Sequence, residues 1–342
     1  MEIACAFPDT DIQSYAIQCI GSASEYNSSC CELFTDPSSF DIIFHFICSE
    51  DTYVSKSAMQ LTSNVIKYTS SHEIRDYIIM KGIIPFLMEN KEMSYTIAEL
   101  LRRLCSIAPP PQEIFLNQIL QFISNVFDKG ASFEILDLLL ESILLLLNNG
   151  TPIAAEQFYG ILPQLILSGL PSIVTNSIKI ISFMSNPPFE FATIFLQVLE
   201  TEDLPAVTKL IAMCFTKFSP LWSGKIDVFN ALSRKIGSVS FQIKVECVRA
   251  MMRYADESVK GNITFFSCVI DCLVSPEIVL DCLNYIRIVI TSPLNDEIKK
   301  MMFEEMNNNI SYFEDLLDGE YDEIVIQGAE FCLNWIESYE NN

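Results

Sequence analysis

The feature that most constrains this chain is a pattern that recurs every 33 to 42 residues. Each recurrence is a run of apolar residues with helical spacing that stops at a helix-breaking cluster. The eight runs begin at Ser57, Thr96, Ile135, Thr175, Ala206, Ile243, Val279 and Ile326. A second helix-like run lies between each pair. Periods of this size are typical of stacked helical repeats, in which each unit buries its apolar face against its neighbours.

The rest of the pattern favours an all-α fold. Strand-like alternation is scarce, and Asn149-Gly150 stands at the end of a helical run instead of between two strands. The sequence therefore predicts an α-solenoid, a superhelix of about eight repeats that forms a single domain over residues 1–342. Residues 1–40 are predicted to be an N-terminal cap, with a helix over IQSYAIQCIGSA and a loop over NSSCCELFTDPSS. Residues 295–342 are predicted to be an acidic C-terminal repeat or cap.

The net charge of the chain limits the classes of partner that it can bind. The net charge is −23, and the segment from Asn295 to the end has 13 acidic residues against Lys299 and Lys300. Such a surface repels phosphate backbones, so no nucleic-acid partner is expected. A basic protein partner would suit it, although acidic surfaces also serve solubility alone.

The cysteines and the apolar runs indicate whether the chain binds a metal, which cellular compartment it occupies and whether it associates with a membrane. The twelve cysteines form no CxxC pair and are joined by only two histidines, so neither a metal site nor a cofactor is expected. Cysteines at helical apolar positions are typical of small buried side chains in a reducing compartment, which favours the cytoplasm, with the nucleus as the alternative. The N-terminus has no secretory signal pattern, and Asp137 and Glu141 interrupt the most apolar run, so no membrane association is expected.

Nothing in the sequence indicates catalysis. The motifs GxGxxG, GxxxxGK[ST], GxSxG and HExxH are all absent. His45 lies in the apolar run IIFHFIC and is expected in the core, and His72 is expected at the surface. The chain is therefore predicted not to be an enzyme.

Residues 71–108 carry the most specific pattern. A short helix over HEIRDYIIMK is expected to end at Gly82, a second over IIPFLMEN has Pro85 in its first turn, and a longer third helix stops before Pro109. This order resembles the armadillo repeat. In the preceding unit, Ala58, Leu61 and Ser63-Asn64 match its third helix. The first helix is reduced around four later positions, as in two-helix HEAT repeats: Pro163, Pro187-Pro188, Pro220 and Pro293.

The resemblance implies that the third helices line a concave groove. Candidate partner-binding residues are the polar side chains on one side of these helices: Gln60, Asn64, Asp137, Glu141, Glu246, Arg249, Asp281, Asn284, Glu330 and Asn334. An asparagine amide can donate to and accept from the backbone of an extended peptide, and Asn64, Asn284 and Asn334 fall at comparable positions. A polar stripe is also what any solvated amphipathic helix has.

The predicted function is therefore a non-enzymatic scaffold or adaptor that binds an extended or helical segment of a protein in its groove. One alternative is a nuclear transport adaptor for basic cargo, similar to importin-α. That family has a tryptophan four residues before such an asparagine, where this chain has Gln60, Leu280 and Glu330. The other alternative is a regulatory subunit of a larger enzyme complex. The sequence leaves the identity of the partner and the oligomeric state open.

Overall fold

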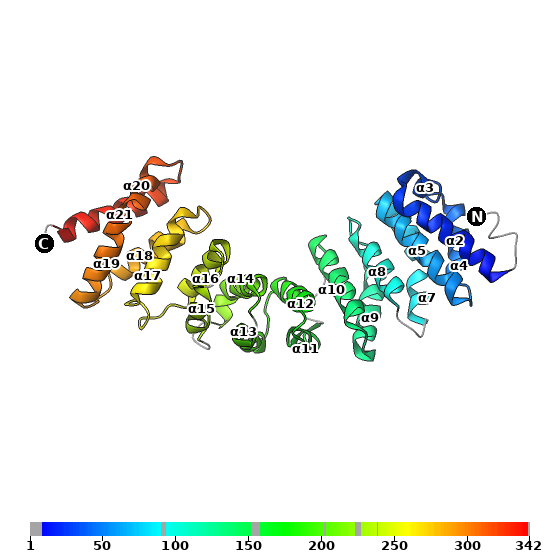
Figure 1. Cartoon of the computed structure of the whole chain (residues 1–342), viewed down its shortest axis with the longest axis horizontal. Coiled ribbons are helices and arrows are strands. Elements are labelled where there is room, and N and C mark those ends of the chain that lie inside the picture. The colour runs from blue at the N-terminus through cyan, green and yellow to red at the C-terminus, as the bar shows by residue number, and fades with distance from the viewer. Residues whose placement is uncertain are drawn as a thin grey trace. The chain divides into compact units, whose positions relative to one another are not determined.

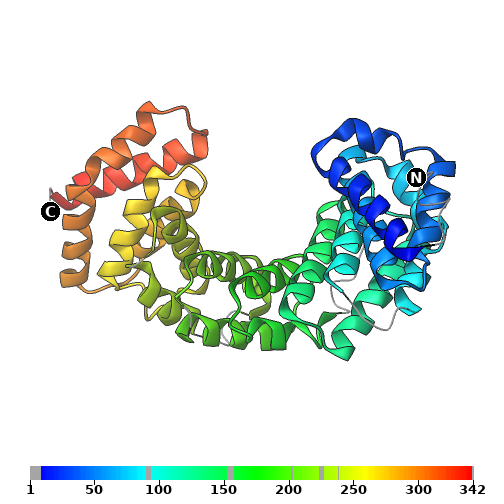
Figure 2. The same ribbon diagram turned by 45° about the vertical axis from the view of Figure 1, so that its right-hand side comes forward.

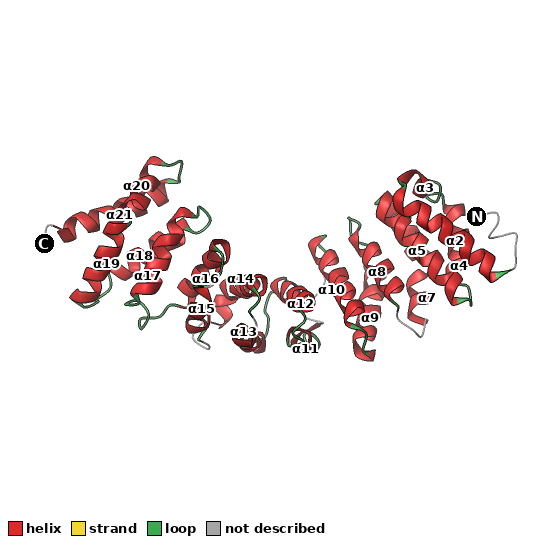
Figure 3. Ribbon diagram, in the orientation of Figure 1, coloured by secondary structure: helices red, strands yellow, loops and turns green. Residues whose placement is uncertain are grey.

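The computed structural model describes residues 9–89, 94–151, 158–201, 203–222, 227–237 and 239–340. Every regular element in these ranges is a helix (Figure 3). The all-α prediction is therefore confirmed for the described part of the chain. In the same ranges no helix combines the length and the apolar character that crossing a bilayer requires.

Each of the eight apolar runs forms a helix, and these are called the stacking helices. They are α5 (Thr52–Thr69), α8 (Tyr95–Ser106), α10 (Phe133–Asn148), α12 (Pro171–Ser182), α14 (Pro205–Trp222), α16 (Phe241–Tyr254), α18 (Val279–Ile290) and α21 (Glu323–Glu340). Helix α5 packs on α8, α8 on α10 and α10 on α12; further along, α14 packs on α16 and α18 on α21. The period in the sequence thus marks helices that lie side by side, which is a helical repeat fold.

The predicted second runs are also helical. They are α6 (His72–Met80), α7 (Ile83–Glu89), α9 (Glu113–Lys129), α11 (Leu162–Ile166), α13 (Phe189–Thr201), α15 (Val228–Ile236), α17 (Ile263–Asp271), the short 3-10 helix η2 (Cys272–Val274), α19 (Asp296–Asn308) and α20 (Ile310–Asp318). The number of complete repeats stays a prediction, because some stacking helices follow one short helix and others follow two.

The three-helix unit that resembles an armadillo repeat has the predicted order. Ser71 begins α6 by accepting a hydrogen bond from the Ile74 amide at 3.3 Å. Gly82 follows the helix with a φ of +88°, a conformation that favours glycine. Pro85 lies in the first turn of α7, where its missing N–H costs little. The sequence here sets each helix boundary through a local rule.

The core confirms the predicted helix register. Ala58 in α5 and Ala98 in α8 are both 0% exposed, as close packing between adjacent stacking helices requires. Leu61 and Leu101 are equally buried in the same helices. Small and large apolar side chains thus interdigitate between neighbouring helices, and their burial drives the stacking.

Pro220 does not end α14, contrary to the expectation from sequence. The helix continues to Trp222, whose ring packs edge-on against Phe195 and Phe215 and is only 1% exposed. The indole N–H of Trp222 donates to the carbonyl of Pro187 at 3.4 Å. Burial of this large ring outweighs the single backbone hydrogen bond that a proline removes near a helix end.

The N-terminal segment is more helical than predicted. The helix over IQSYAIQCIGSA is confirmed as α2 (Thr10–Tyr26), which packs along α5. The predicted loop is wrong in part, because it contains α3 (Ser28–Glu32) and leads into α4 (Pro37–Ile47). Cys31 is buried in α3, and its thiol donates to the carbonyl of Ser24 at 3.4 Å. Because the residues around Cys31 are polar, the sequence did not indicate that its side chain is buried.

The chain folds into two compact units. Unit 1 is Met1–Met184 and unit 2 is Ser185–Asn342. In Figure 2 the blue-to-green helices of unit 1 lie side by side, and Figure 1 labels the helices of both units. A single repeat domain over the whole chain stays a prediction, and each unit is described by itself.

Candidate functional site

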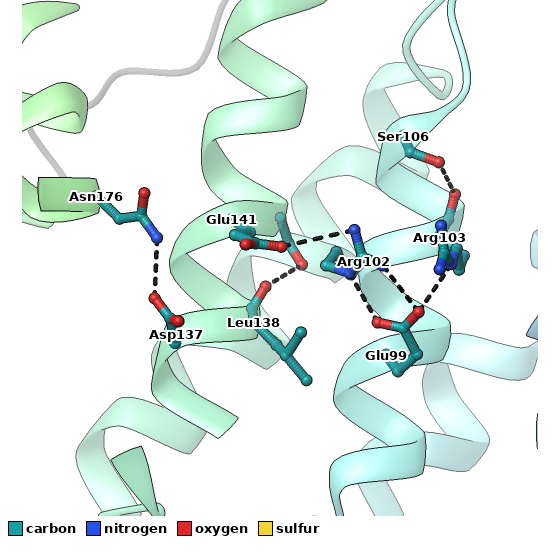
Figure 4. A network of polar contacts seen from close by, with 9 residues as sticks. Glu99, Arg102, Arg103, Ser106, Asp137, Leu138, Glu141 and Asn176 are labelled. Carbon is teal, nitrogen blue, oxygen red and sulfur yellow. Dashed lines mark hydrogen bonds and ion pairs between the residues drawn. The ribbon is translucent and has the colours of Figure 1, made fainter. Parts of the chain in front are cut away.

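Polar side chains on three stacking helices of unit 1 form two groups of contacts that meet at α10 and are together called the polar ladder (Figure 4). Its members are Glu99, Arg102, Arg103, Asp137, Glu141 and Asn176. Glu99 in α8 accepts from Nε of Arg102 at 2.7 Å and from Nε of Arg103 at 2.8 Å. These partners lie three and four residues along the helix, where side chains share one face.

The ladder crosses from one helix to the next in two places. Nη1 of Arg102 lies 3.5 Å from Oε2 of Glu141 in α10. One turn earlier in α10, Asp137 accepts from the Asn176 amide of α12 at 2.9 Å. The two carboxylates predicted to share one side of α10 therefore do so, and each is held by a different neighbouring helix (Figure 4).

The charges of the ladder are partly balanced. Burial acts to raise the pKa of the Glu99 carboxyl, but the hydrogen bonds and charges of Arg102 and Arg103 outweigh it, so this pKa lies below its ordinary value. The hydrogen bond that Arg102 donates to the Glu99 carboxylate raises the pKa of the Arg102 guanidinium. The side chain of Glu141 is 43% exposed and lies next to Arg102, whose charge Glu99 already pairs. Its free oxygen positions can accept hydrogen bonds from another molecule.

Asn64 does not belong to the exposed polar face. It is 6% exposed, and its Nδ2 donates to the Gly21 carbonyl at 3.0 Å and to the Ser24 hydroxyl at 3.3 Å. Helix α2 covers this side of α5, so the amide fastens the two helices together. Gln60 is exposed next to it, with its Nε2 3.5 Å from Oδ1 of Asn64.

In unit 2 the predicted residues link α16 to α18. Arg249 pairs with Glu246 at 2.7 Å within α16 and donates through Nη2 to the Glu277 carbonyl at 2.9 Å. Arg253 in the next turn pairs with Asp281 of α18 at 3.2 Å. Glu246 is 8% exposed, so its carboxylate serves Arg249.

The last three candidates face solvent. Asn284 in α18, and Glu330 and Asn334 in α21, are exposed and make no side-chain hydrogen bond or ion pair within the described ranges. They are the candidates in unit 2 with their polar groups available to a partner.

Sequence reasoning missed four members of the polar ladder. Glu99, Arg102 and Arg103 were detectable from their three- and four-residue spacing, which is that of ion pairs on a helix. Asn176 had no such signal, because its partner Asp137 lies 39 residues earlier. That contact depends on how two helices are aligned.

The described residues include no group of three His, Cys, Asp or Glu side chains placed to hold a metal ion. The eleven described cysteines are free thiols, and burial raises the pKa of Cys105, Cys214 and Cys332 to about 12.

The two histidines are both exposed. This confirms the prediction for His72, but the prediction that His45 lies in the core is wrong. Helix α4 turns Ile43 and Phe46 inward, which leaves His45 on the outside.

No model of a known protein family matches the chain, and no curated protein matches it. An engineered protein solved by the Northeast Structural Genomics Consortium superimposes with a TM-score of 0.61 at 14% identity, over 98% of this chain and 97% of the other. The karyopherin Kap121p, solved with the extreme C-terminus of the phosphatase Cdc14p, gives a TM-score of 0.46 at 12% identity, over 94% of this chain and 35% of Kap121p. The first likeness is one of fold and covers almost the whole of both chains.

Proposed function

We propose that this chain is a non-enzymatic protein-interaction module of the armadillo type. It binds an extended or helical segment of a partner along the polar face of its stacking helices. The observation that carries this proposal is the polar ladder, in which one polar side chain of α10 contacts α8 and another contacts α12. Extended surfaces of this kind are the usual binding surfaces of helical repeat proteins.

The fixed positions of the carboxylates support this function. Arg102 and Asn176 hold Glu141 and Asp137 from opposite neighbours, so these side chains have less rotamer freedom to lose when a partner binds. Such a module holds the partner segment in position through several weak contacts and catalyses no reaction. The carboxylates suit a protein or peptide with N–H donors or basic side chains, in the cytoplasm or the nucleus, and they disfavour nucleic acid.

The transport-adaptor alternative has less support. The tryptophans that importin-α places before its asparagines are replaced by Gln60, Leu280 and Glu330. Asn64, one of the three candidate asparagines, is occupied by α2. A free-standing module and a regulatory subunit differ in their partner, which affinity capture identifies directly.

The test is affinity capture from cells with quantitative mass spectrometry, comparing the unmodified chain with Asp137→Lys/Glu141→Lys. Asp137 and Glu141 are half-buried, and Asp137→Lys also removes the acceptor of the buried Asn176. A second variant, Asp137→Asn/Glu141→Gln, therefore removes the charges and keeps oxygen acceptors. Both variants are expected to lose the same partner while far-UV circular dichroism stays unchanged.

The matched control is Glu200→Lys/Glu314→Lys, which makes the same charge change at exposed positions of α13 and α20. It should retain the partner. Binding by a basic segment should also weaken as salt is added, because salt screens exposed charge pairs. If the control loses the partner as completely as the ladder variants, or if those variants keep it, the polar face is not the binding site. Turnover of a substrate by the pure chain would contradict the non-enzymatic assignment.

A further inference from the structure

An open cleft of about 760 Å³ lies in unit 2, whereas the polar ladder belongs to unit 1. It is bounded by the start of α18 and by the corner that joins α20 to α21 (helices labelled in Figure 1). One wall is apolar and contains Pro276, Val279, Leu280 and Val325. Leu280 is 38% exposed, so part of this wall is open to a ligand. The volume is within the range of clefts that hold a few side chains.

The remaining polar part of the lining is acidic and is called the acidic wall. It contains Asp315, Glu320 and Asp322, which are exposed and have no cationic partner within the described ranges. After Lys300 the sequence has eleven acidic residues and no lysine, arginine or histidine. Arg249 and Arg253 contact Glu277 and Asp281 on the α18 side of the cleft. The carboxylates of the α20–α21 corner have no cation near them in the sequence, so this corner favours cationic groups.

An aromatic ring is fixed at the corner of the cleft. A Cβ atom on Gly319 would lie 2.7 Å from Cε2 of Tyr321 and 3.1 Å from the Asp315 carbonyl. Glycine at this position therefore allows the ring of Tyr321 to lie directly against the backbone of the corner. An aromatic face beside carboxylates attracts a guanidinium or ammonium group through both interactions.

These features discriminate between classes of ligand. A metal ion is disfavoured, because the described acidic side chains do not converge in a group of three. Nucleic acid is repelled by the same carboxylates. A ligand that fits both walls has cationic groups for the acidic wall and apolar groups for Pro276 and Leu280, the exposed residues of the apolar wall.

We propose that this cleft binds a segment of a protein partner in which arginine or lysine side chains alternate with apolar side chains. The inference rests on the proposed function, since it gives the interaction module a contact in unit 2. The apolar residues would pack against Pro276 and Leu280, and the cationic groups would meet Asp315, Glu320, Asp322 and the ring of Tyr321.

The probes are two fluorescent synthetic peptides of equal length and charge, one alternating arginine with leucine and the other alternating arginine with serine. Binding to the full chain is measured by fluorescence anisotropy at low and moderate salt. The arginine–leucine peptide should bind about tenfold more tightly, since only its leucines bury area against the apolar wall. Equal binding of the two peptides would mean that net charge alone attracts them, which overturns the cleft as a site.

Two triple variants separate the cleft from net charge. Asp315→Asn/Glu320→Gln/Asp322→Asn should weaken the arginine–leucine peptide about tenfold or more, because it removes the whole acidic wall. Glu297→Gln/Glu304→Gln/Glu340→Gln removes the same charge from exposed positions of α19 and α21 and should change affinity by no more than about twofold. Equal losses in the two triple variants would overturn the proposal.

Gly319→Ala tests the wall without a change of charge. Its methyl group displaces the Tyr321 ring, so affinity should fall while the thermal transition of the chain is checked in parallel. Tyr321→Ala removes the ring itself and covers the case in which the alanine variant is unstable. If both variants fold and bind normally, the ring has no part in the site.

The peptide assay also distinguishes this inference from the proposed function. Asp137→Lys/Glu141→Lys leaves the cleft unchanged and should keep the arginine–leucine peptide. If that variant loses the peptide and the cleft triple variant keeps it, the cleft inference fails while the polar-ladder function stands. If the ladder variant keeps the natural partner in the capture experiment, the proposed function fails whatever the peptides do.

Discussion

The guanidinium of Arg75 in α6 donates through Nη1 to the carbonyl of Ile107, 2.5 Å away, directly after the end of α8. The same nitrogen donates to the Pro109 carbonyl, and Nε and Nη2 both lie 2.8 Å from Oδ1 of Asp76. The side chain of Arg75 is 1% exposed. A buried cation thus satisfies carbonyl groups that the end of a helix leaves without partners, and it joins the first and third helices of one repeat unit.

The first prediction is that Arg75→Met destabilises unit 1 by roughly 3 kcal/mol, because the buried carbonyl of Ile107 loses its donor and Asp76 loses its cation. Arg75→Lys should recover only part of this loss, since an ammonium group lacks the planar fork that reaches Asp76 and the carbonyls together. Urea denaturation followed by circular dichroism gives the change.

The matched control for Arg75 is Arg253→Met, which removes an exposed ion pair with Asp281. Exposed pairs contribute about 0–1 kcal/mol, so this change should be small. Equal denaturation midpoints for Arg75→Met and the unmodified chain would show that the buried guanidinium is not needed for stability.

The second prediction concerns the packing between stacking helices. Ala58→Leu and Ala98→Leu add a larger side chain at positions that are 0% exposed and should each destabilise by about 1–3 kcal/mol. Ala206→Leu, at an exposed position of α14, is the control and should have little effect. Unchanged unfolding midpoints for both buried substitutions would mean that these interfaces have room to spare.

The third prediction is a pH dependence from Glu99. Its folded-state pKa lies below the ordinary value of 4.5, so the folded state favours the charged carboxylate. The stabilisation is fully present above pH 4.5 and is lost as the pH falls through the lower folded-state pKa. The difference in unfolding free energy between the unmodified chain and Glu99→Gln should therefore shrink as the pH falls below 4.5. A difference that stays constant through the acid transition of the chain would contradict this expectation.

The fold was predictable because local rules decide most of it. Gly82 and Ser71 set helix boundaries through backbone geometry and capping, and the apolar spacing placed Ala58 and Ala98 in the core. Pro220 was misjudged because the burial of Trp222 is a tertiary effect that overrides a local breaker.

The candidate site was less predictable because it depends on the alignment of helices. Asp137 and Asn176 meet across 39 residues, a contact that no single helix encodes. The exposed stripe of α5 was misread at Asn64, since nothing within α5 indicates that α2 covers that side. A stripe of polar residues predicts which side of a helix lacks apolar contacts. It does not distinguish a side that faces solvent from a side that is covered by polar residues of another helix.

The last prediction separates the two roles that an asparagine has in this fold. Asn64→Ala removes the donors to Gly21 and Ser24 from a buried position and should destabilise by about 1–3 kcal/mol. Asn284→Ala removes an exposed amide from α18 and should change stability by less than about 0.5 kcal/mol. If α18 takes part in binding, only the second substitution weakens the captured partner in a folded chain. Urea unfolding and quantitative capture of both variants give the values needed. A destabilised Asn284→Ala, or a fully stable Asn64→Ala that loses the partner, would reverse the assignment and place Asn64 in the binding surface.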